Sequence, residues 1–322
     1  MGNNDWKNAL LKSGLPLESA AARALVRRDF AVTNEYIFSR SDLGVSKDFS
    51  IDIEATKYFS VDTGAAEQII GQLHLLVECK YRAPNTRWVF AADPNVGGFS
   101  PITLGGTIRT FDQISSVELP GNCMVPFDRN LNFTFRGIEY GHSSEGYDAE
   151  IRRGLTQLQY GLPRLLCELI LHRLYNHPED RKDPFFFAPI LLTTAEIFVL
   201  KRNISPDKIR EAESIEQVAK KVDYCVAFKD YGPDFERHCQ QTFGAIYSST
   251  SKELIDQIDA ARVRKKPYGH SLESVLSGLE NAERFFLRRY FDQFIVCEYS
   301  AFGRLVDRII RLTGSTLTKL NS

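Results

Sequence analysis

The sequence predicts an α/β protein: a mixed central β-sheet flanked by helices, with an irregular insertion and a C-terminal helical segment. Apolar and polar residues alternate through 49–59 and 73–82, as in strands with one buried face. A nearly continuous apolar run at 189–200 is typical of a buried strand or a pair of strands in a sheet covered on both faces. Apolar residues at helical spacing in 147–175 and 271–312 supply the helices.

Composition places the chain among ordinary globular proteins. Of its 322 residues, 43% are hydrophobic and 25% are charged. The formal net charge of -1 does not favour a general polyanion binder, so nucleic-acid binding would need local basic clusters such as Arg152 with Arg153, or 262–266. The six cysteines form no C-x-x-C pair, which argues against a zinc ribbon and against a disulfide framework.

The first residues and the most apolar run bear on where the protein is located. Residues 1–7 lack the basic and then apolar pattern of a signal peptide. The most apolar run, 185–200, is interrupted by Thr193, Thr194 and Glu196 and is shorter than a membrane span. We therefore expect a cytoplasmic protein that does not enter a membrane.

The N-terminal region predicts two helices and a strand. Segments 6–11 and 17–28 carry apolar residues at helical spacing, and 30–38 alternates like a strand. Glu18 falls in the first turn of the second helix, where the helix dipole favours an acid. That dipole explains Glu18 as well as a role in a functional site does.

Two strand-like segments at the centre of the prediction carry charged residues on one face. In 49–59, alternation places Ile51, Ile53 and Ala55 on one face, and Asp52 on the other with Glu54. We expect this second, polar face to line a site.

The second of these segments, 73–82, places Glu78 and Lys80 on one face, about 6 to 7 Å apart along the strand. The polar stretch 60–72 between the two segments contains glycines and predicts a hairpin-like return. Such a hairpin brings Asp52 beside Glu78.

The rest of the first 248 residues is predicted less sharply. Segment 91–146 is rich in Gly and Pro and is expected to be a substrate-facing insertion or a small β subdomain. A helix is predicted at 147–175, kinked or interrupted at Pro163. Short strands are predicted at 224–228 and 242–247.

The chain divides, by this interpretation, into an α/β domain at 1–248 and a C-terminal helical segment at 249–322. The amphipathic stretch 271–312 can pack on the first domain or join two copies in a homodimer.

Two carboxylates and an amine on one strand surface need partners, because burying such charges alone costs several kcal/mol. Mg²⁺ would provide one, since it binds one or two carboxylates together with waters and substrate phosphate. The alternative is a cross-strand salt bridge that joins Lys80 to Asp52 or Glu54 on a solvated face.

The stretches 50–55 (Ser-Ile-Asp-Ile-Glu-Ala) and 76–81 (Leu-Val-Glu-Cys-Lys-Tyr) resemble the core of the PD-(D/E)xK nuclease superfamily, the restriction-endonuclease-like fold, including its Mrr-like and related bacterial branches. Ile51 stands where the Pro of the motif would be. Segment 13–18 is similar to the acidic first helix of that fold, and 157–160 (Gln-Leu-Gln-Tyr) resembles a glutamine-containing helix beside the catalytic strands.

The resemblance implies a Mg²⁺-dependent nuclease, with Mn²⁺ as a substitute, that cleaves DNA in preference to RNA in phage defence or repair. It implies that Asp52 and Glu78 hold the metal with the main-chain carbonyl of Cys79, and that Lys80 positions or activates the attacking water. Supporting roles fall to two further residues, Glu18 and Gln157. The alternative is a non-catalytic module of the same fold that binds nucleic acid or a protein partner.

Overall fold

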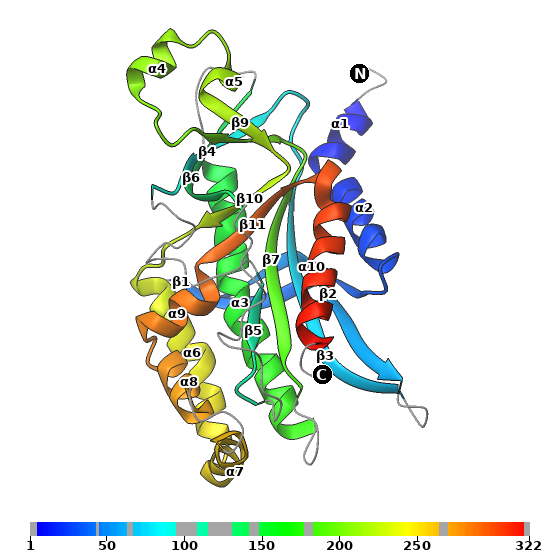
Figure 1. Cartoon of the computed structure of the whole chain (residues 1–322), viewed down its shortest axis with the longest axis vertical. Helices are drawn as coiled ribbons and strands as arrows, with labels where there is room; N and C mark the ends of the chain where they lie inside the picture. The colour runs from blue at the N-terminus through cyan, green and yellow to red at the C-terminus, as the bar shows by residue number, and fades with distance from the viewer. Residues whose placement is uncertain are drawn as a thin grey trace.

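The computed structural model describes most of the chain. The described residues are 5–42, 45–62, 67–94, 108–114, 131–141, 148–176, 183–263 and 270–318. Within them, eleven strands form one mixed sheet with helices on both faces (Figure 1), so the predicted α/β class is confirmed. The order along the sheet is β1-β2-β3-β7-β11-β10-β6-β4-β8-β9, and β5 pairs with β7.

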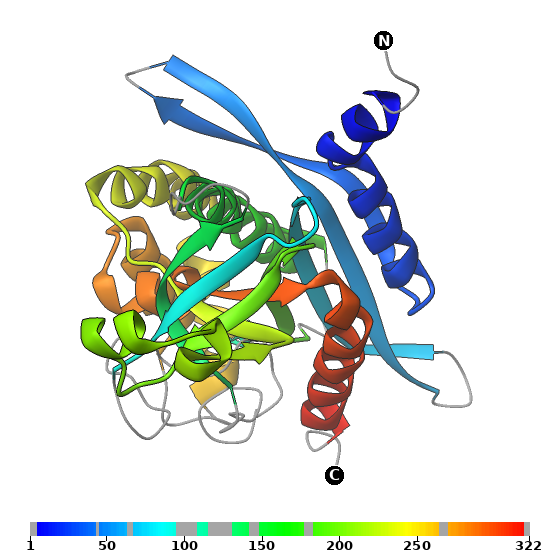
Figure 2. The ribbon, with the colours of Figure 1, turned by 90° about the horizontal axis from the view of Figure 1, so that it is seen from above.

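One half of the sheet is an antiparallel meander of β1, β2 and β3, and β3 then pairs in parallel with β7. Both flanks of β3 are therefore hydrogen-bonded, and every residue from Gly71 to Cys79 is buried. Strands β2 and β3 extend beyond the part of the sheet that the helices cover. Figure 2 shows a hairpin past the helices at each end of β2. The bounds are β1 Ala31–Asp42, β2 Val45–Asp62, β3 Glu67–Lys80 and β7 Phe185–Thr193.

The other half begins at β11, which is parallel to β7 and antiparallel to β10. Strand β6 continues the sheet in parallel with β10, and β4, β8 and β9 follow. Trp88 of β4 is fully buried and packs in the same apolar cluster as Phe90. The bounds are β4 Arg87–Ala92, β5 Arg109–Phe111, β6 Phe133–Tyr140, β8 Glu196–Leu200, β9 Ala219–Val222, β10 Tyr224–Phe228 and β11 Gln293–Glu298.

Helices cover the two faces with separate apolar clusters. On one face, α2 and α10 bury leucines and valines of β3, among them Leu73, Leu75 and Val77. On the other, α3 packs on Leu76 and Leu191, and α6, α8 and α9 complete the layer. Figure 2 shows α3 and α10 on opposite sides of the strands. The bounds are α2 Leu15–Val26, α3 Ala149–Asn176, α6 Pro233–Ser249, α8 Leu272–Glu280, α9 Arg284–Phe291 and α10 Phe302–Thr318.

Five further helices complete the described secondary structure: α1 Asp5–Lys12, α4 Pro206–Glu211, α5 Ile215–Val218, α7 Lys252–Val263 and the 3-10 helix η2 Tyr299–Ala301. Among the described helices, none is both long and apolar enough to span a lipid bilayer.

The expectation that 249–322 is wholly helical is wrong, because this stretch contributes β11 to the middle of the sheet. Phe294 and Ile295 are fully buried between β7 and β10. A short apolar run cannot be assigned to helix or strand by periodicity alone, and here its aromatic and β-branched residues favour the strand. Most apolar side chains of the predicted dimer seam are buried within this chain, and the homodimer stays a prediction.

Three smaller predictions fail, wholly for the first segment and for one of two alternatives in the other two. Segment 242–247 lies inside α6 and is not a strand. Pro163 does not interrupt α3, because the apolar stripe buried on both sides of the proline outweighs one missing hydrogen bond. The described strands of 91–146, β5 and β6, pair with the main sheet and form no subdomain of their own. Residues 95–107, 115–130 and 142–146 of this segment lie outside the described residues.

Candidate active site

The predicted hairpin brings Asp52 beside the end of β3. The paired register of β2 and β3 runs up to Ile53 opposite Val77 and ends there. The main-chain N–H of Cys79 donates instead to Oδ2 of Asp52, at 2.6 Å. The Asp52 carboxylate therefore holds β3 where the ladder ends, and its position is set by main-chain geometry.

The predicted alternation of β2 breaks at this point. Ile53 and Ala55 pack in the cluster under α2 and α10, as one face of a strand should. Ile51 packs instead in the cluster of α3 with Phe38, on the other side of the sheet. The expectation that all three share a face is wrong, because β2 leaves its regular pairing with β3 at Asp52 and its side chains change sides there.

Glu78 and Lys80 face α3, on the same side of β3 as the buried Leu76. Nζ of Lys80 donates to Oε1 of Glu78 at 2.6 Å and to Oε1 of Gln157 at 3.2 Å. The Gln157 amide is itself oriented, because its Nε2 donates to the carbonyl oxygen of Ser50 at 3.1 Å. The structure thus brings Gln157 of α3 to the amine between β2 and β3.

The alternative salt bridge, with Lys80 paired to Asp52 or Glu54, is not what forms. Lys80 pairs with Glu78 on its own strand. Oε1 of Glu54 accepts a hydrogen bond from the hydroxyl of Thr56 at 2.8 Å and lies 3.4 Å from Nδ1 of His74. Glu54 therefore belongs to a separate polar group on the hairpin.

The carboxyl of Glu78 is strongly perturbed by its surroundings. The side chain is 1% exposed, and its Oε2 has no hydrogen-bond partner among the residues that the structure describes. Burial and the neighbouring Asp52 charge raise the pKa of Glu78 to about 7, although Lys80 opposes the shift. Burial also raises the pKa of Asp52, against the stabilising hydrogen bond from Cys79. The ammonium of Lys80 lowers the pKa of both carboxyls but does not offset the effect of their burial.

Glu18 lies near this pair from the other face of the sheet. A Cβ on Gly14, the N-cap of α2, would lie 2.8 Å from Oε1 of Glu18, so the carboxylate folds back over the start of its helix. Burial raises its pKa, and the charge of Asp52 raises it further. Glu18 is thus an acid in the first turn of its helix and also lies near Asp52.

One acid near the site was not predicted from sequence. Glu35 of β1 has a φ of 59°, in the left-handed region that non-glycine residues seldom adopt. It falls between the pairs Asn34 with Ile53 and Tyr36 with Ile51, and so stands opposite Asp52. Its charge contributes to the raised pKa of Asp52 and of Glu18. The one sequence signal for Glu35 is the register of the β1–β2 hairpin. Counting back from the pair Asp42 with Val45 places Glu35 opposite Asp52.

The donor set fits a hard divalent cation. The unpartnered Oε2 of Glu78 and the oxygens of Asp52 are the ligand type that Mg²⁺ prefers. In the part of the chain that the structure describes, no group of three or more His, Cys, Asp and Glu side chains is arranged to hold a metal ion. Any cation here would therefore depend on two side chains, a main-chain carbonyl, water and substrate.

Comparison with known proteins adds no relative: no family model, no curated protein and no solved structure matches this chain. The indications of function are therefore the site itself and the short motifs around it.

Proposed function

We propose that this protein is a Mg²⁺-dependent nuclease of the PD-(D/E)xK kind that hydrolyses phosphodiester bonds, with DNA as its substrate. The observation that carries the proposal is the meeting of Asp52, Glu78 and Lys80 where the β2–β3 ladder ends. Within the described part of the chain, one oxygen of the buried Glu78 is left without a hydrogen-bond partner. A buried carboxylate in that state costs several kcal/mol, which favours a functional role over a stabilising one.

Lys80, Gln157 and Glu18 have separate roles in the proposed hydrolysis. Lys80, held between Glu78 and Gln157, orients the water that attacks phosphorus and offsets negative charge on the phosphate. Gln157 keeps the amine of Lys80 in place through its own bond to the Ser50 carbonyl. Glu18 adds negative potential beside Asp52.

Asp52 and Glu78, with the main-chain carbonyl of Cys79, would hold the cation. When bound, Mg²⁺ supplies Lewis-acid stabilisation of the charge that develops on the phosphate and the leaving oxygen. Mn²⁺ accepts the same oxygen ligands and is expected to replace it.

The first test is cleavage of supercoiled plasmid, linear duplex, single-stranded DNA and single-stranded RNA with Mg²⁺ or with EDTA. Lys80→Ala and Asp52→Ala should each lower the Mg²⁺-dependent rate by about 100-fold or more, since each removes a group that acts on the transition state. The far-UV circular dichroism of both variants should match that of the wild type.

Two residues of β2 outside the site provide matched controls. Asp48→Ala removes an acid that binds only the Ser39 hydroxyl among the interactions described, and Lys57→Ala removes an amine paired with Asp29. Both variants should cleave at the wild-type rate. Cleavage by Lys80→Ala at the wild-type rate would remove the proposed role. If the wild type binds these substrates and cleaves none, the non-catalytic module is the better interpretation.

A further inference from the structure

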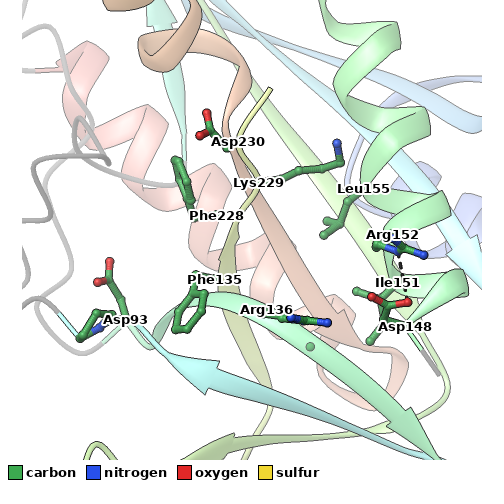
Figure 3. A pocket seen from close by; sticks show the side chains of 12 residues that line it. Asp93, Phe135, Arg136, Asp148, Ile151, Arg152, Leu155, Phe228, Lys229 and Asp230 are labelled. Atoms are coloured by element: carbon green, nitrogen blue, oxygen red, sulfur yellow. Dashed lines mark ion pairs between the residues drawn. The ribbon is translucent and has the colours of Figure 1, made fainter. Parts of the chain in front are cut away.

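A cavity of about 830 Å³ lies beside the first turns of α3, between β6 and the end of β10 (Figure 3). Its wall on α3 includes Ile151 and Leu155. Successive helix residues are about 100° apart, so Leu155 and Gln157 point to well-separated flanks of α3. The cavity is therefore distinct from the site at Lys80, yet one helix borders both.

The apolar part of the cavity wall has the geometry of a stacking site. Phe135 of β6 is 51% exposed, and Phe228 at the end of β10 is half-buried. Figure 3 shows these two rings on one side of the space and the α3 side chains on the other. An aromatic face left open to a cavity of this size can stack on a flat heteroaromatic ring, and the volume lies within the usual range for small-ligand pockets.

The polar part of the wall carries both signs of charge. Arg136 and Arg152 are exposed, and Lys229 is half-buried with its Nζ donating to Oε1 of Gln159 at 2.7 Å. Gln159 is fixed in turn, because its Nε2 donates to the carbonyl oxygens of Lys229 and Phe291. The ammonium of Lys229 is thus held in a set position at the wall.

Carboxylates complete the wall: Asp148 pairs with Arg152 at 3.2 Å, and Asp230 follows Lys229. Cations at the rim suit a phosphate, whereas carboxylates accept hydrogen bonds from the N–H groups of a base. A ligand that combines a flat ring bearing N–H donors with an anionic group satisfies both parts of the wall.

We propose that this cavity binds one unstacked nucleotide, with its base against Phe135 and Phe228 and its phosphate on Arg136 and Arg152. The nucleotide belongs either to a single-stranded or locally unpaired polynucleotide or to a free mononucleotide. In the first case the inference rests on the proposed nuclease function and names its substrate class, a strand with at least one unpaired base.

The test measures binding without catalysis, in EDTA and on the Lys80→Ala protein. Fluorescence anisotropy with labelled dT12 should give an affinity that Phe135→Ala lowers about tenfold, the expected effect of losing one base stack. Arg152→Ala should lower the affinity about fivefold and reduce its salt dependence by about one phosphate contact. Unlabelled thymidine monophosphate, used as a competitor, shows whether a free nucleotide suffices.

The chain offers a close control for each change. Arg153 neighbours Arg152, has a similar exposed fraction (69% against 70%) and pairs with Glu150, but does not line the cavity. Ile138 is 43% exposed on β6 and also lies outside the cavity wall. Arg153→Ala and Ile138→Ala should change the affinity less than about twofold, since neither removes a stack or a phosphate contact at the cavity.

Equal losses in the cavity variants and their controls would overturn the proposal, as would the absence of binding by both dT12 and thymidine monophosphate, the latter measured by titration calorimetry. Competition by thymidine monophosphate that depends on Phe135 supports the cavity with a free nucleotide as ligand. Binding of dT12 alone supports the polynucleotide. The binding assay requires no cleavage. It therefore tests the cavity even if the protein proves not to be a nuclease.

Discussion

At the scale of single residues, the buried carboxyl of Glu78 sets how the site responds to pH. Its pKa is raised from 4.5 to about 7, chiefly by burial, so the fold favours the protonated form. The stability that this protonation contributes is complete below about pH 4.5 and is lost as the pH rises through about 7. At pH 8 the folded protein therefore carries an ionised Glu78 at a cost in free energy.

Glu78→Gln should raise the free energy of unfolding at pH 8 by up to about 3 kcal/mol, because the neutral amide avoids that cost. The difference should shrink toward pH 5. Urea denaturation in EDTA at both pH values measures it. Glu196→Gln is a control of opposite sign: the bond from Lys221 lowers the pKa of Glu196, so its loss should weaken the protein at pH 8. Equal stability of Glu78→Gln and wild type at pH 8 would contradict the assignment of a strained carboxyl.

At the scale of elements, α3 approaches the sheet closely enough to bring Gln157 to Lys80. Glycines on its inner face allow this approach: a Cβ on Gly154 would lie 2.5 Å from Cδ1 of Leu191 and 3.4 Å from Cε of Lys80, and one on Gly161 would meet Cδ1 of Ile51. Ile51, on the α3 side of the sheet, thus packs closely against the helix at Gly161.

Gly161→Ala should lower the free energy of unfolding by about 1 to 3 kcal/mol, because the added methyl overfills the space against Ile51 and Phe38. Gly244→Ala in α6 is the matched helical control, since its Cβ would meet only Oε1 of Glu280, at 3.9 Å. Helix propensity alone should make that variant more stable by about 0.5 to 1 kcal/mol. Chemical denaturation measures the free energy of unfolding of both variants. A stabilised Gly161→Ala would show that the space between α3 and the sheet can hold an added methyl group.

At the scale of the whole molecule, the sheet depends on a strand from the end of the chain. β11 lies between β7 and β10, and α10 follows it to cover the face shared with α2. Without residues 249–322, β7 and β10 lose their common neighbour, and the apolar cluster under α2 loses Phe302, Leu305 and Ile309.

A chain that ends at residue 248 should therefore not fold cooperatively, as judged by near-UV circular dichroism and thermal melting. The control is a chain that begins at residue 13 and lacks α1, whose side chains from Trp6 onward are exposed. That chain should keep the wild-type melting transition, because little buried apolar surface is lost. A sharp melting transition for 1–248 would instead favour a separable C-terminal segment.

Local pattern was enough to predict much of this arrangement. Alternation identified the strands that carry Asp52, Glu78 and Lys80, and helical spacing identified the helix that carries Gln157. It failed where neighbours distant in the sequence decide the outcome. From sequence alone β11 is predicted as part of a helical stretch, and its pairing with β7 and β10 is what makes it a strand. Ile51 lies on the opposite side of the sheet from Ile53 because the pairing of β2 with β3 ends at Ile53.

The order of polar and apolar residues alone determined the α/β class and placed Asp52, Glu78 and Lys80 on strand faces, since burial of one face per element requires that periodicity. Only the tertiary structure decided that Lys80 pairs with Glu78 and Gln157, that Glu35 stands opposite Asp52, and that a cavity opens on the other flank of α3. Those outcomes depend on strand register and on the distance between a helix and a sheet, which short-range pattern does not encode.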